Sequence, residues 1–165
     1  SINLSIKDLE QESLADDFEL LITASGLPAS LIRFEITESA LMIDINKAID
    51  TMHKLTQLGV ILALDDFGTG YSSLKYLKEF PIEIIKIDRS FVKDIGIDRN
   101  DEAIIDSIIV MANSLGMYCI AEGVETREQL AFLTERKCAL IQGFLYSKPV
   151  PKEDALALIE RDFSF

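Results

Sequence analysis

The sequence contains few of the residues on which nucleophilic enzymes commonly depend. Its 165 residues include one histidine, two cysteines, four prolines and no tryptophan. His53 lies in a helical pattern, where a position on the helix surface is the simplest interpretation, and Cys119 lies in an apolar, strand-like run. Catalytic triads built on histidine or cysteine are therefore not expected. Any catalysis must depend on carboxylates, lysine or metal ions.

Long apolar stretches are also missing. None approaches the roughly 20 residues that a membrane-spanning helix needs, and the first residues lack a signal-peptide pattern. Cys119 and Cys138 are too few for a disulfide framework and are interpreted as reduced thiols. These features predict a cytoplasmic domain with no membrane span in this segment, although a longer parent protein could be attached to a membrane through upstream segments.

Positive charge is scarce. Sixteen lysines and arginines stand against 28 aspartates and glutamates, which gives a net charge of −12. Such a surface repels polyanions, so nucleic-acid polymers and anionic membranes are not expected partners. A small phosphate-containing substrate remains compatible if cations screen an acidic site. Because 48% of the residues are hydrophobic, a folded core is expected rather than disorder.

Short apolar runs alternate with amphipathic runs along the chain. The predicted strands are 2–4, 32–36, 60–64, 82–87, 117–121 and 140–141, and the predicted helices are 9–25, 45–58, 73–78, 101–115, 127–135 and 152–160. Strict alternation implies parallel strands joined by right-handed crossovers. Two architectures fit, an open doubly wound sheet and a TIM-type (βα)8 barrel. The six repeats taken alone favour the open sheet, because a closed barrel needs eight.

Two helix starts carry recognisable capping residues. Asp44 precedes the predicted helix 45–58 and belongs to the residue types favoured at an N-cap. Thr126 and Gln129 form a capping-box pattern at the start of the predicted helix 127–135.

Polar residues recur where the predicted strands end. They are Asn3, Glu35, Glu38, Asp65, Asp66, Lys86, Asp88, Glu122, Glu125 and Gln142. In both architectures ligands bind at the carboxyl ends of the strands, so this set is a candidate site. Simpler interpretations remain open for single residues, with Asn3 in a turn, Glu125 as a solvated acid and Gln142 as part of a turn.

Asp65, Asp66 and Lys86 are the hardest of these to explain by structure alone. Two adjacent carboxylates would repel each other without a cation, and an unpaired ammonium is costly to bury in an apolar strand. An ion pair of Lys86 with Asp65 or Asp88 is the simpler alternative. Carboxylate and amide oxygens without histidine or cysteine suit Mg²⁺, Mn²⁺ or Ca²⁺ rather than zinc. Two such ions would clamp a phosphodiester and generate a hydroxide nucleophile.

The ordered motifs resemble the EAL-domain family of cyclic di-GMP phosphodiesterases. The matching segments are Asn3-Leu4-Ser5, Phe34-Glu35-Ile36-Thr37-Glu38-Ser39, Leu64-Asp65-Asp66-Phe67-Gly68-Thr69-Gly70-Tyr71-Ser72-Ser73, Ile85-Lys86-Ile87-Asp88, Ala121-Glu122-Gly123-Val124-Glu125 and Gln142-Gly143-Phe144. The resemblance covers essentially the whole chain. It implies a TIM-type (βα)8 barrel, of which about six repeats are present, and so overrides the count that favours an open sheet.

The resemblance also implies a metal-dependent reaction. Asn3, Glu35 and Asp65 would ligate a first metal ion, and Asp65 and Asp66 a second, with Glu122 as a further ligand or a residue that orders metal-bound water. The ions would be Mg²⁺ or Mn²⁺, with Ca²⁺ inhibitory. The implied reaction is hydrolysis of cyclic di-GMP to linear pGpG.

The remaining polar residues receive supporting roles from the same resemblance. Lys86 would position the attacking water and act as general base or electrostatic stabiliser. Glu38 would anchor the loop 66–73, and Gln142 would hold a water or the substrate. Asp88 and Glu125 would support the site from further away.

One departure from the family pattern concerns the start of the chain. The family's Glu-Ala-Leu strand precedes the Asn-Leu-Ser motif, and nothing here precedes Ser1. The resemblance therefore implies that 1–165 is an EAL domain lacking its first strand or strands and a helix, and that this chain alone is inactive. A homodimer is expected, together with an upstream sensor or GGDEF domain in the parent protein.

Two other functions remain open. A non-catalytic EAL-like module would bind cyclic di-GMP or a protein partner without hydrolysis. Independently of the resemblance, a metal-dependent phosphatase on an open sheet could use Asp65 and Asp66, one of them as an aspartyl nucleophile.

Overall fold

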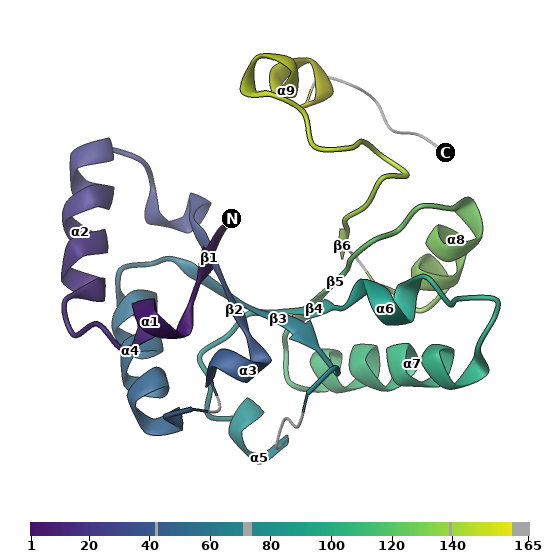
Figure 1. Cartoon of the computed structure of the whole chain (residues 1–165), viewed down its shortest axis with the longest axis horizontal. Coiled ribbons are helices and arrows are strands. Elements are labelled where there is room, and N and C mark those ends of the chain that lie inside the picture. Colours follow the sequence, from purple (N-terminus) through teal and green to yellow (C-terminus); the bar gives the residue numbers. More distant parts are fainter. Residues whose placement is uncertain (42, 71–73, 139, 160–165) are drawn as a thin grey trace.

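Six parallel strands form a single sheet at the centre of the protein (Figure 1). The computed structural model describes residues 1–41, 43–70, 74–138 and 140–159. The strands are β1 (Ile2–Leu4), β2 (Arg33–Thr37), β3 (Ile61–Phe67), β4 (Ile84–Ile87), β5 (Tyr118–Ala121) and β6 (Leu140–Ile141). All six lie at or within a few residues of the ranges that hydrophobic patterning predicts.

The strand order decides between the two predicted architectures. The strands lie side by side in chain order, β1-β2-β3-β4-β5-β6, and every neighbouring pair is parallel. A doubly wound sheet requires a point at which the strand order reverses, whereas a TIM-type barrel adds each strand beside the previous one. The prediction of a TIM-type architecture with six βα repeats is confirmed.

Helices connect successive strands, and one more follows the last strand. They are α1 (Ile6–Leu9), α2 (Leu14–Ser25), α3 (Glu38–Leu41), α4 (Ile45–Gln57), α5 (Leu74–Leu77), α6 (Arg89–Val92), α7 (Arg99–Ser114), α8 (Arg127–Glu135) and α9 (Lys152–Ile159), with a 3₁₀ turn at Ala29–Leu31. None of these helices is both long and apolar enough to cross a membrane. Residues 73 and 160, at the ends of two predicted helices, lie outside the described residues.

The structure corrects the prediction of one helix over 9–25. The segment forms two helices, because Ser5 and Asp8 make a reciprocal capping box that starts α1 early, and the chain turns before α2 begins at Leu14. Two short helices, α3 and α6, were not predicted. Each begins within a residue or two of the end of a strand and lasts four residues, too short for a helical hydrophobic period to show.

The predicted capping residues are confirmed. The Asp44 carboxylate accepts a hydrogen bond from Lys47 N at 3.1 Å, at the start of α4. Thr126 and Gln129 form the capping box of α8. Each cap satisfies backbone N–H groups that the first helical turn leaves without a partner.

The two faces of the sheet differ in what they bury. Phe34, Leu62 and Ile85, on β2, β3 and β4, belong to the large core cluster that the sheet shares with the surrounding helices. The opposite face carries a smaller apolar cluster of Ala63, Ile84 and Ile120. Because side chains alternate along each strand, the residues of this second face are also those that lead into the polar site.

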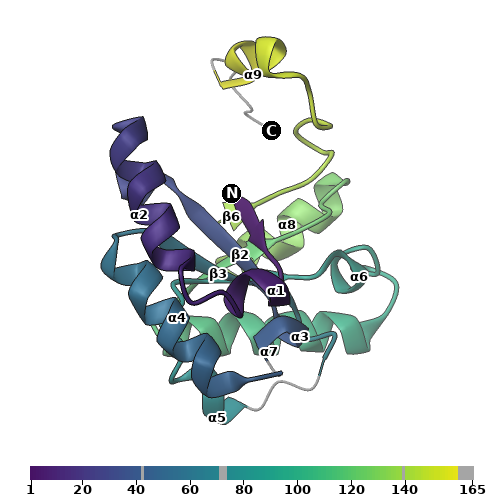
Figure 2. The same cartoon turned by 60° about the vertical axis from the view of Figure 1, so that its left-hand side comes forward.

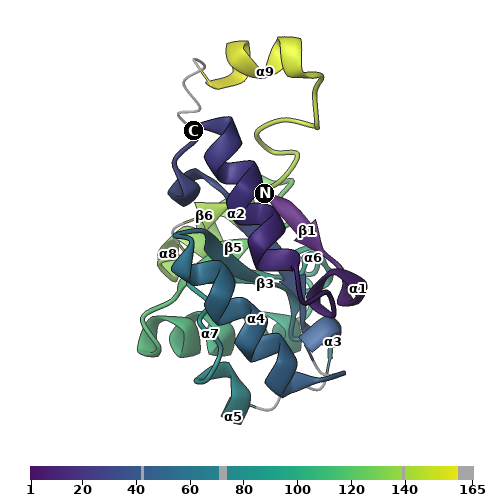
Figure 3. The same ribbon diagram turned by 90° about the vertical axis from the view of Figure 1, so that its left-hand side faces the viewer.

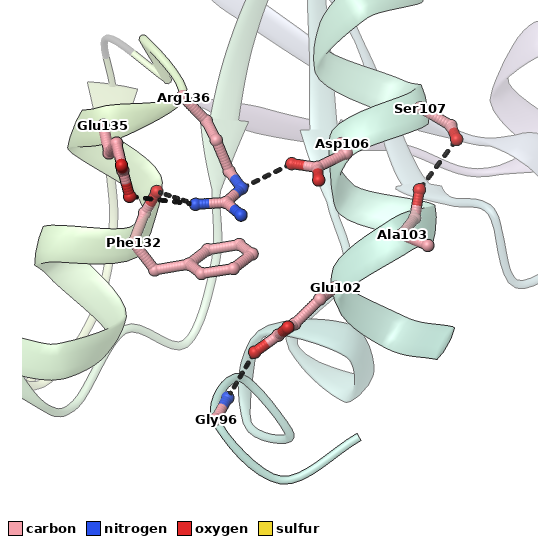
Figure 4. Close-up of polar contacts among 8 residues, drawn as sticks. All are labelled: Gly96, Glu102, Ala103, Asp106, Ser107, Phe132, Glu135 and Arg136. Carbon is pink, nitrogen blue, oxygen red and sulfur yellow. Dashed lines mark hydrogen bonds and ion pairs between the residues drawn. The ribbon is translucent and has the colours of Figure 1, made fainter. Parts of the chain in front are cut away.

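The helices α7 and α8 are joined by a polar contact. The guanidinium of Arg136, just after α8, pairs with Asp106 on α7 and also donates to the Phe132 carbonyl at 3.2 Å (Figure 4). The guanidinium carbon lies 3.3 Å from the centre of the Phe132 ring, a cation–π arrangement. The contact fixes α8, which begins directly after the loop that carries Glu122.

The last helix, α9, is the least buried of the described elements. It follows an extended segment and stands apart from the other helices (Figures 1, 2 and 3). None of its described residues is buried, and Leu156 and Ile159 are 70% and 79% exposed.

Candidate active site

Four charged side chains from four neighbouring strands meet at the carboxyl ends of the sheet. Glu35 lies on β2, Asp65 on β3 and Lys86 on β4, and Glu122 directly follows β5. Glu35 and Lys86 each stand between two residues of the large core cluster, so alternation along the strand turns them to the other face. Alternation along the strands alone therefore places Glu35 and Lys86 on the inner face of the sheet.

Lys86 is the centre of this group. Its Nζ lies 2.6 Å from Glu35 Oε2, 2.9 Å from Asp65 Oδ1 and 2.6 Å from Glu122 Oε1, and the side chain is only 3% exposed. An ammonium has three N–H donors, and here each finds a carboxylate. The prediction of an ion pair between Lys86 and Asp65 is borne out, but the lysine has three acidic partners.

The electrostatics follow from that arrangement. Burial acts to lower the pKa of Lys86, but its contacts with Glu122, Glu35 and Asp65 outweigh burial and raise that pKa. Lys86 is therefore protonated at neutral pH and has no free site for a further proton. In this state the ammonium can stabilise negative charge that develops on a phosphate.

The acids respond differently to the same environment. Burial and the negative charges of Asp65 and Glu35 raise the pKa of Glu122 in spite of Lys86. For Glu35, burial also acts to raise the pKa, but the contacts with Lys86 and Ser1 and the positive charges of Lys86 and the N-terminal amino group outweigh it, and the net shift is downward. With three carboxylates around one ammonium, the site has more acidic groups than its lysine can neutralise.

Asp65, Asp66 and Glu122 form the acidic cluster of the site. One carboxylate oxygen of each lies within 4.8 Å of the others. Asp66 adopts a left-handed backbone conformation with φ of 53°, and its N–H donates to Asp65 Oδ1 at 3.1 Å. Burial and repulsion from Asp65 and Asp88 raise the pKa of Asp66. A cluster of oxygen donors with excess negative charge is the kind of site that Mg²⁺ or Mn²⁺ occupies.

Asp88 has a structural task at the edge of this cluster. Its carboxylate caps α6 by accepting a hydrogen bond from Ser90 N at 2.8 Å. Burial acts to raise the pKa of Asp88, but the hydrogen bonds from Ser90 and from the Arg89 backbone, with the contact to Asp66, outweigh it and lower that pKa. The side chain also contacts Asp66, so α6 and the acidic cluster are connected through one carboxylate.

Asn3 lies beside the site on β1. It is in register with Glu35 on β2, and because paired residues of parallel strands share a face, the amide is placed next to that carboxylate. Its side chain is exposed.

Glu38 lies under the loop that follows β3. The side chain is 2% exposed, and its Oε2 accepts a hydrogen bond from Gly68 N at 3.3 Å. A Cβ at Gly70 would lie 2.8 Å from Glu38 Oε1, so the loop backbone approaches this carboxylate closely. The contact joins Glu38 to the start of loop 66–73, of which residues 71–73 lie outside the described residues.

The turn after Glu122 is held from three directions. Glu122 N donates to the Ile87 carbonyl at 3.1 Å, and Val124 N donates to the Gln142 carbonyl at 3.1 Å. From α8, Gln129 Oε1 accepts hydrogen bonds from Glu125 N at 2.7 Å and Thr126 N at 3.0 Å. Sequence reasoning identified Gln129 only as a cap, and the bond from Glu125 N goes beyond that role.

A groove runs from the acidic cluster along this turn. The predicted residues Glu122, Glu125 and Gln142 line it, together with others that were not predicted as site residues, among them Arg89, Phe144 and Lys148. Arg89 directly follows Asp88 at the end of β4, a position that would have justified including it. Lys148 lies 5.7 Å from the ring centre of Phe144, so a cation and an aromatic ring stand together in the groove wall.

The fold and site together define an α/β domain of the TIM-barrel type with an acidic centre at the carboxyl ends of its strands. Residues 1–149 match the family model described as EAL domain. The chain belongs to the EAL domain family, as its motifs suggest.

Relatives in this family include signalling phosphodiesterases. The chain is 45% identical to the cyclic di-GMP phosphodiesterase NbdA of Pseudomonas aeruginosa over 151 residues, which are 92% of this chain and 19% of NbdA. It is 38% identical to MucR of the same organism, a bifunctional diguanylate cyclase/cyclic di-GMP phosphodiesterase, over 96% of this chain and 23% of MucR. The chain thus spans about a fifth of the length of these relatives.

Solved structures share the fold. The MucR phosphodiesterase in complex with c-di-GMP superposes with a TM-score of 0.89 at 38% identity, covering 93% of this chain and 62% of that one. Klebsiella pneumoniae BlrP1, in a complex with manganese and cyclic di-GMP, gives a TM-score of 0.83 at 34% identity, covering 90% of this chain and 38% of that one.

Proposed function

We propose that this chain is the larger part of a metal-dependent phosphodiesterase domain that hydrolyses cyclic di-GMP to linear pGpG. The observation that carries the proposal is the cluster of Asp65, Asp66 and Glu122 around the buried Lys86, at the end of the sheet where barrel enzymes bind their substrates. Cyclic di-GMP is the ligand of the related MucR and BlrP1 complexes, which supports the choice of substrate.

The acids of this chain suit two divalent ions. Asp65, Asp66 and Glu122 would hold one, and Asn3 and Glu35 would join Asp65 in holding the other. When bound, Mg²⁺ or Mn²⁺ supplies charge neutralisation at the phosphate and a water of lowered pKa. The excess of negative charge around Lys86, and the upward shift in the pKa of Asp66, support the presence of cations in the working site. Ca²⁺ is proposed to inhibit.

The other residues would act on the substrate and its surroundings. Lys86, which is protonated, would orient the attacking water and stabilise negative charge that develops on the phosphate. Gln142 and Glu125, with Arg89 and Lys148, would line the path of the dinucleotide along the groove. Glu38 would hold the loop after Asp66 in place.

Several wider predictions belong to the same proposal. A cytoplasmic location is supported by two buried free cysteines, Cys119 and Cys138. A GGDEF domain in the parent protein is supported by the relation to MucR, which is described as bifunctional. The homodimer stays a prediction from the family resemblance.

Barrel closure is expected to matter for activity. In the described structure β1 and β6 are the two edges of the sheet, and a TIM-type barrel closes with eight strands. We propose that the Glu-Ala-Leu segment characteristic of the family completes the catalytic domain.

The test is hydrolysis of cyclic di-GMP with Mg²⁺ or Mn²⁺. The 165-residue chain is compared with the same chain preceded by the Glu-Ala-Leu segment of a family member. Only the extended protein, and not the 165-residue chain, is expected to form pGpG, because the added strand closes the barrel. Binding of cyclic di-GMP by the extended protein without hydrolysis would instead favour the non-catalytic module, and a trapped aspartyl phosphate would favour the phosphatase.

A further inference from the structure

Lys86 and a divalent cation would require the same carboxylates. The ammonium contacts Asp65 Oδ1 and Glu122 Oε1, and both residues belong to the acidic cluster with Asp66. Each of the three lysine protons is already directed at an acid, counting Glu35 as the third. The lysine therefore occupies coordination sites that the proposed function needs for metal.

We infer that Lys86 is a built-in competitor for the metal site, which holds the acids together in the metal-free protein and leaves Asp65 and Glu122 when the site is loaded. The inference rests on the proposed function, because it assumes that these acids are metal ligands. It adds that metal affinity is set by an internal cation, and that the lysine becomes free to act on water or phosphate only in the loaded site.

Charge balance explains why both states can form. Glu35, Asp65 and Glu122 with Lys86 carry a net charge of −2, which is three negative charges and one positive charge. This remaining charge attracts a divalent ion, while the ammonium repels it. Removing the ammonium would leave buried carboxylates without a counter-charge, which is strongly destabilising unless a cation replaces it.

The experiment uses the 165-residue chain and Mn²⁺ alone. Binding is followed by the loss of the free-Mn²⁺ signal in electron paramagnetic resonance, and stability by thermal unfolding with and without Mn²⁺. Lys86→Met removes the charge and keeps an unbranched side chain. Lys86→Arg keeps the charge, and Lys54→Met removes an exposed lysine of α4 that is not among the residues of the acidic cluster.

Lys86→Met is expected to lower the melting temperature in the absence of metal and to show a larger rise with Mn²⁺ than the wild type. Its affinity for Mn²⁺ is expected to increase about tenfold or more, because a positive charge next to the ion is removed. Lys86→Arg and Lys54→Met are expected to bind Mn²⁺ no more tightly than the wild type. Binding by Lys86→Met alone would also support the inference.

The opposite outcomes separate the inference from the proposed function. If the wild type binds Mn²⁺ and Lys86→Met binds it equally or more weakly, Lys86 does not compete with the metal ion and the inference is wrong, while the proposed metal site stands. If neither binds Mn²⁺, the inference is wrong, whereas the proposed function is decided by hydrolysis of cyclic di-GMP in the extended protein. Should Lys86→Met be unfolded without metal, refolding on addition of Mn²⁺, followed by circular dichroism, supports the inference. The double variant Glu35→Gln/Lys86→Met, with one fewer unpaired acid, is compared with Glu35→Gln, because both lack the same carboxylate. Failure of the double variant to bind Mn²⁺ more tightly than Glu35→Gln would overturn the inference.

Discussion

Gly143 lies directly against the backbone of Val124. A Cβ at Gly143 would overlap both the carbonyl oxygen and the nitrogen of Val124, and no flexible side chain is involved that could move away. The close approach lets Val124 N donate to the Gln142 carbonyl and Leu145 N donate to the Val124 carbonyl. The turn that carries Glu122 and Glu125 is thus seated against the segment that follows β6.

Gly143→Ala is expected to destabilise the fold by about 2–3 kcal/mol, because the added methyl group must push two backbone segments apart. Gly116→Ala is the matched control. Gly116 has a φ of +74° but nothing within 4 Å of its Cβ position, so only conformational strain of about 1 kcal/mol is expected there. Urea unfolding of the three proteins measures the difference. Equal losses in both variants would show that steric contact with Val124 is unimportant.

Gln129 holds the other end of the same turn. Its Oε1 accepts two backbone N–H groups, from Glu125 and Thr126, and the side chain is buried. Gln129→Leu leaves both donors without a partner and is expected to cost about 2 kcal/mol. Gln129→Glu keeps an acceptor oxygen and should lose much less.

A further variant controls for the general effect of replacing a glutamine by leucine. Gln57→Leu, at the exposed last residue of α4, removes no such contact and is expected to change the unfolding free energy little. Chemical denaturation distinguishes the variants. A Gln129→Glu variant as unstable as Gln129→Leu would mean that packing, rather than hydrogen bonding to the turn, explains the loss.

The strand faces were predictable from sequence, whereas the partners of the charged groups were not. Alternation in β2 and β4 places Glu35 and Lys86 on the inner face, and this depends only on local pattern. The meeting of Lys86 with Glu35 joins residues 51 positions apart, and its geometry depends on strand register and twist. Gly143 illustrates the same limit, since its need for glycine arises from contact with a different segment.

The two cysteines make stability depend on alkaline pH. Burial raises the pKa of Cys119 from 9.0 to about 12, helped by repulsion from Cys138, and burial raises the pKa of Cys138 from 9.0 to about 11. Because the folded pKa values exceed the unfolded ones, the stabilisation is complete below about pH 9 and is lost as the pH rises toward these values.

The double variant Cys119→Ala/Cys138→Ala isolates this effect. It is expected to be less stable than the wild type at neutral pH because buried volume is lost. Its unfolding free energy should nevertheless fall less steeply between about pH 9 and about pH 11. Lys86 is unchanged in both proteins, so its own titration cancels in the comparison. Parallel slopes would contradict the assignment to the thiols.

Asp65 is the residue on which the proposed chemistry depends most directly. It contacts Lys86, accepts the Asp66 N–H and belongs to the acidic cluster with Glu122. Asp65→Asn keeps an acceptor oxygen for the Asp66 N–H but removes the negative charge that a divalent ion needs. In a complete domain, preceded by the Glu-Ala-Leu segment, this variant is expected to lose Mg²⁺-supported hydrolysis of cyclic di-GMP while its far-ultraviolet circular dichroism remains that of the wild type.

Asp50→Asn, at an exposed position of α4, is the control and should retain full activity. Full activity in Asp65→Asn would remove Asp65 from the metal site and leave its bond to Lys86 as a purely structural ion pair.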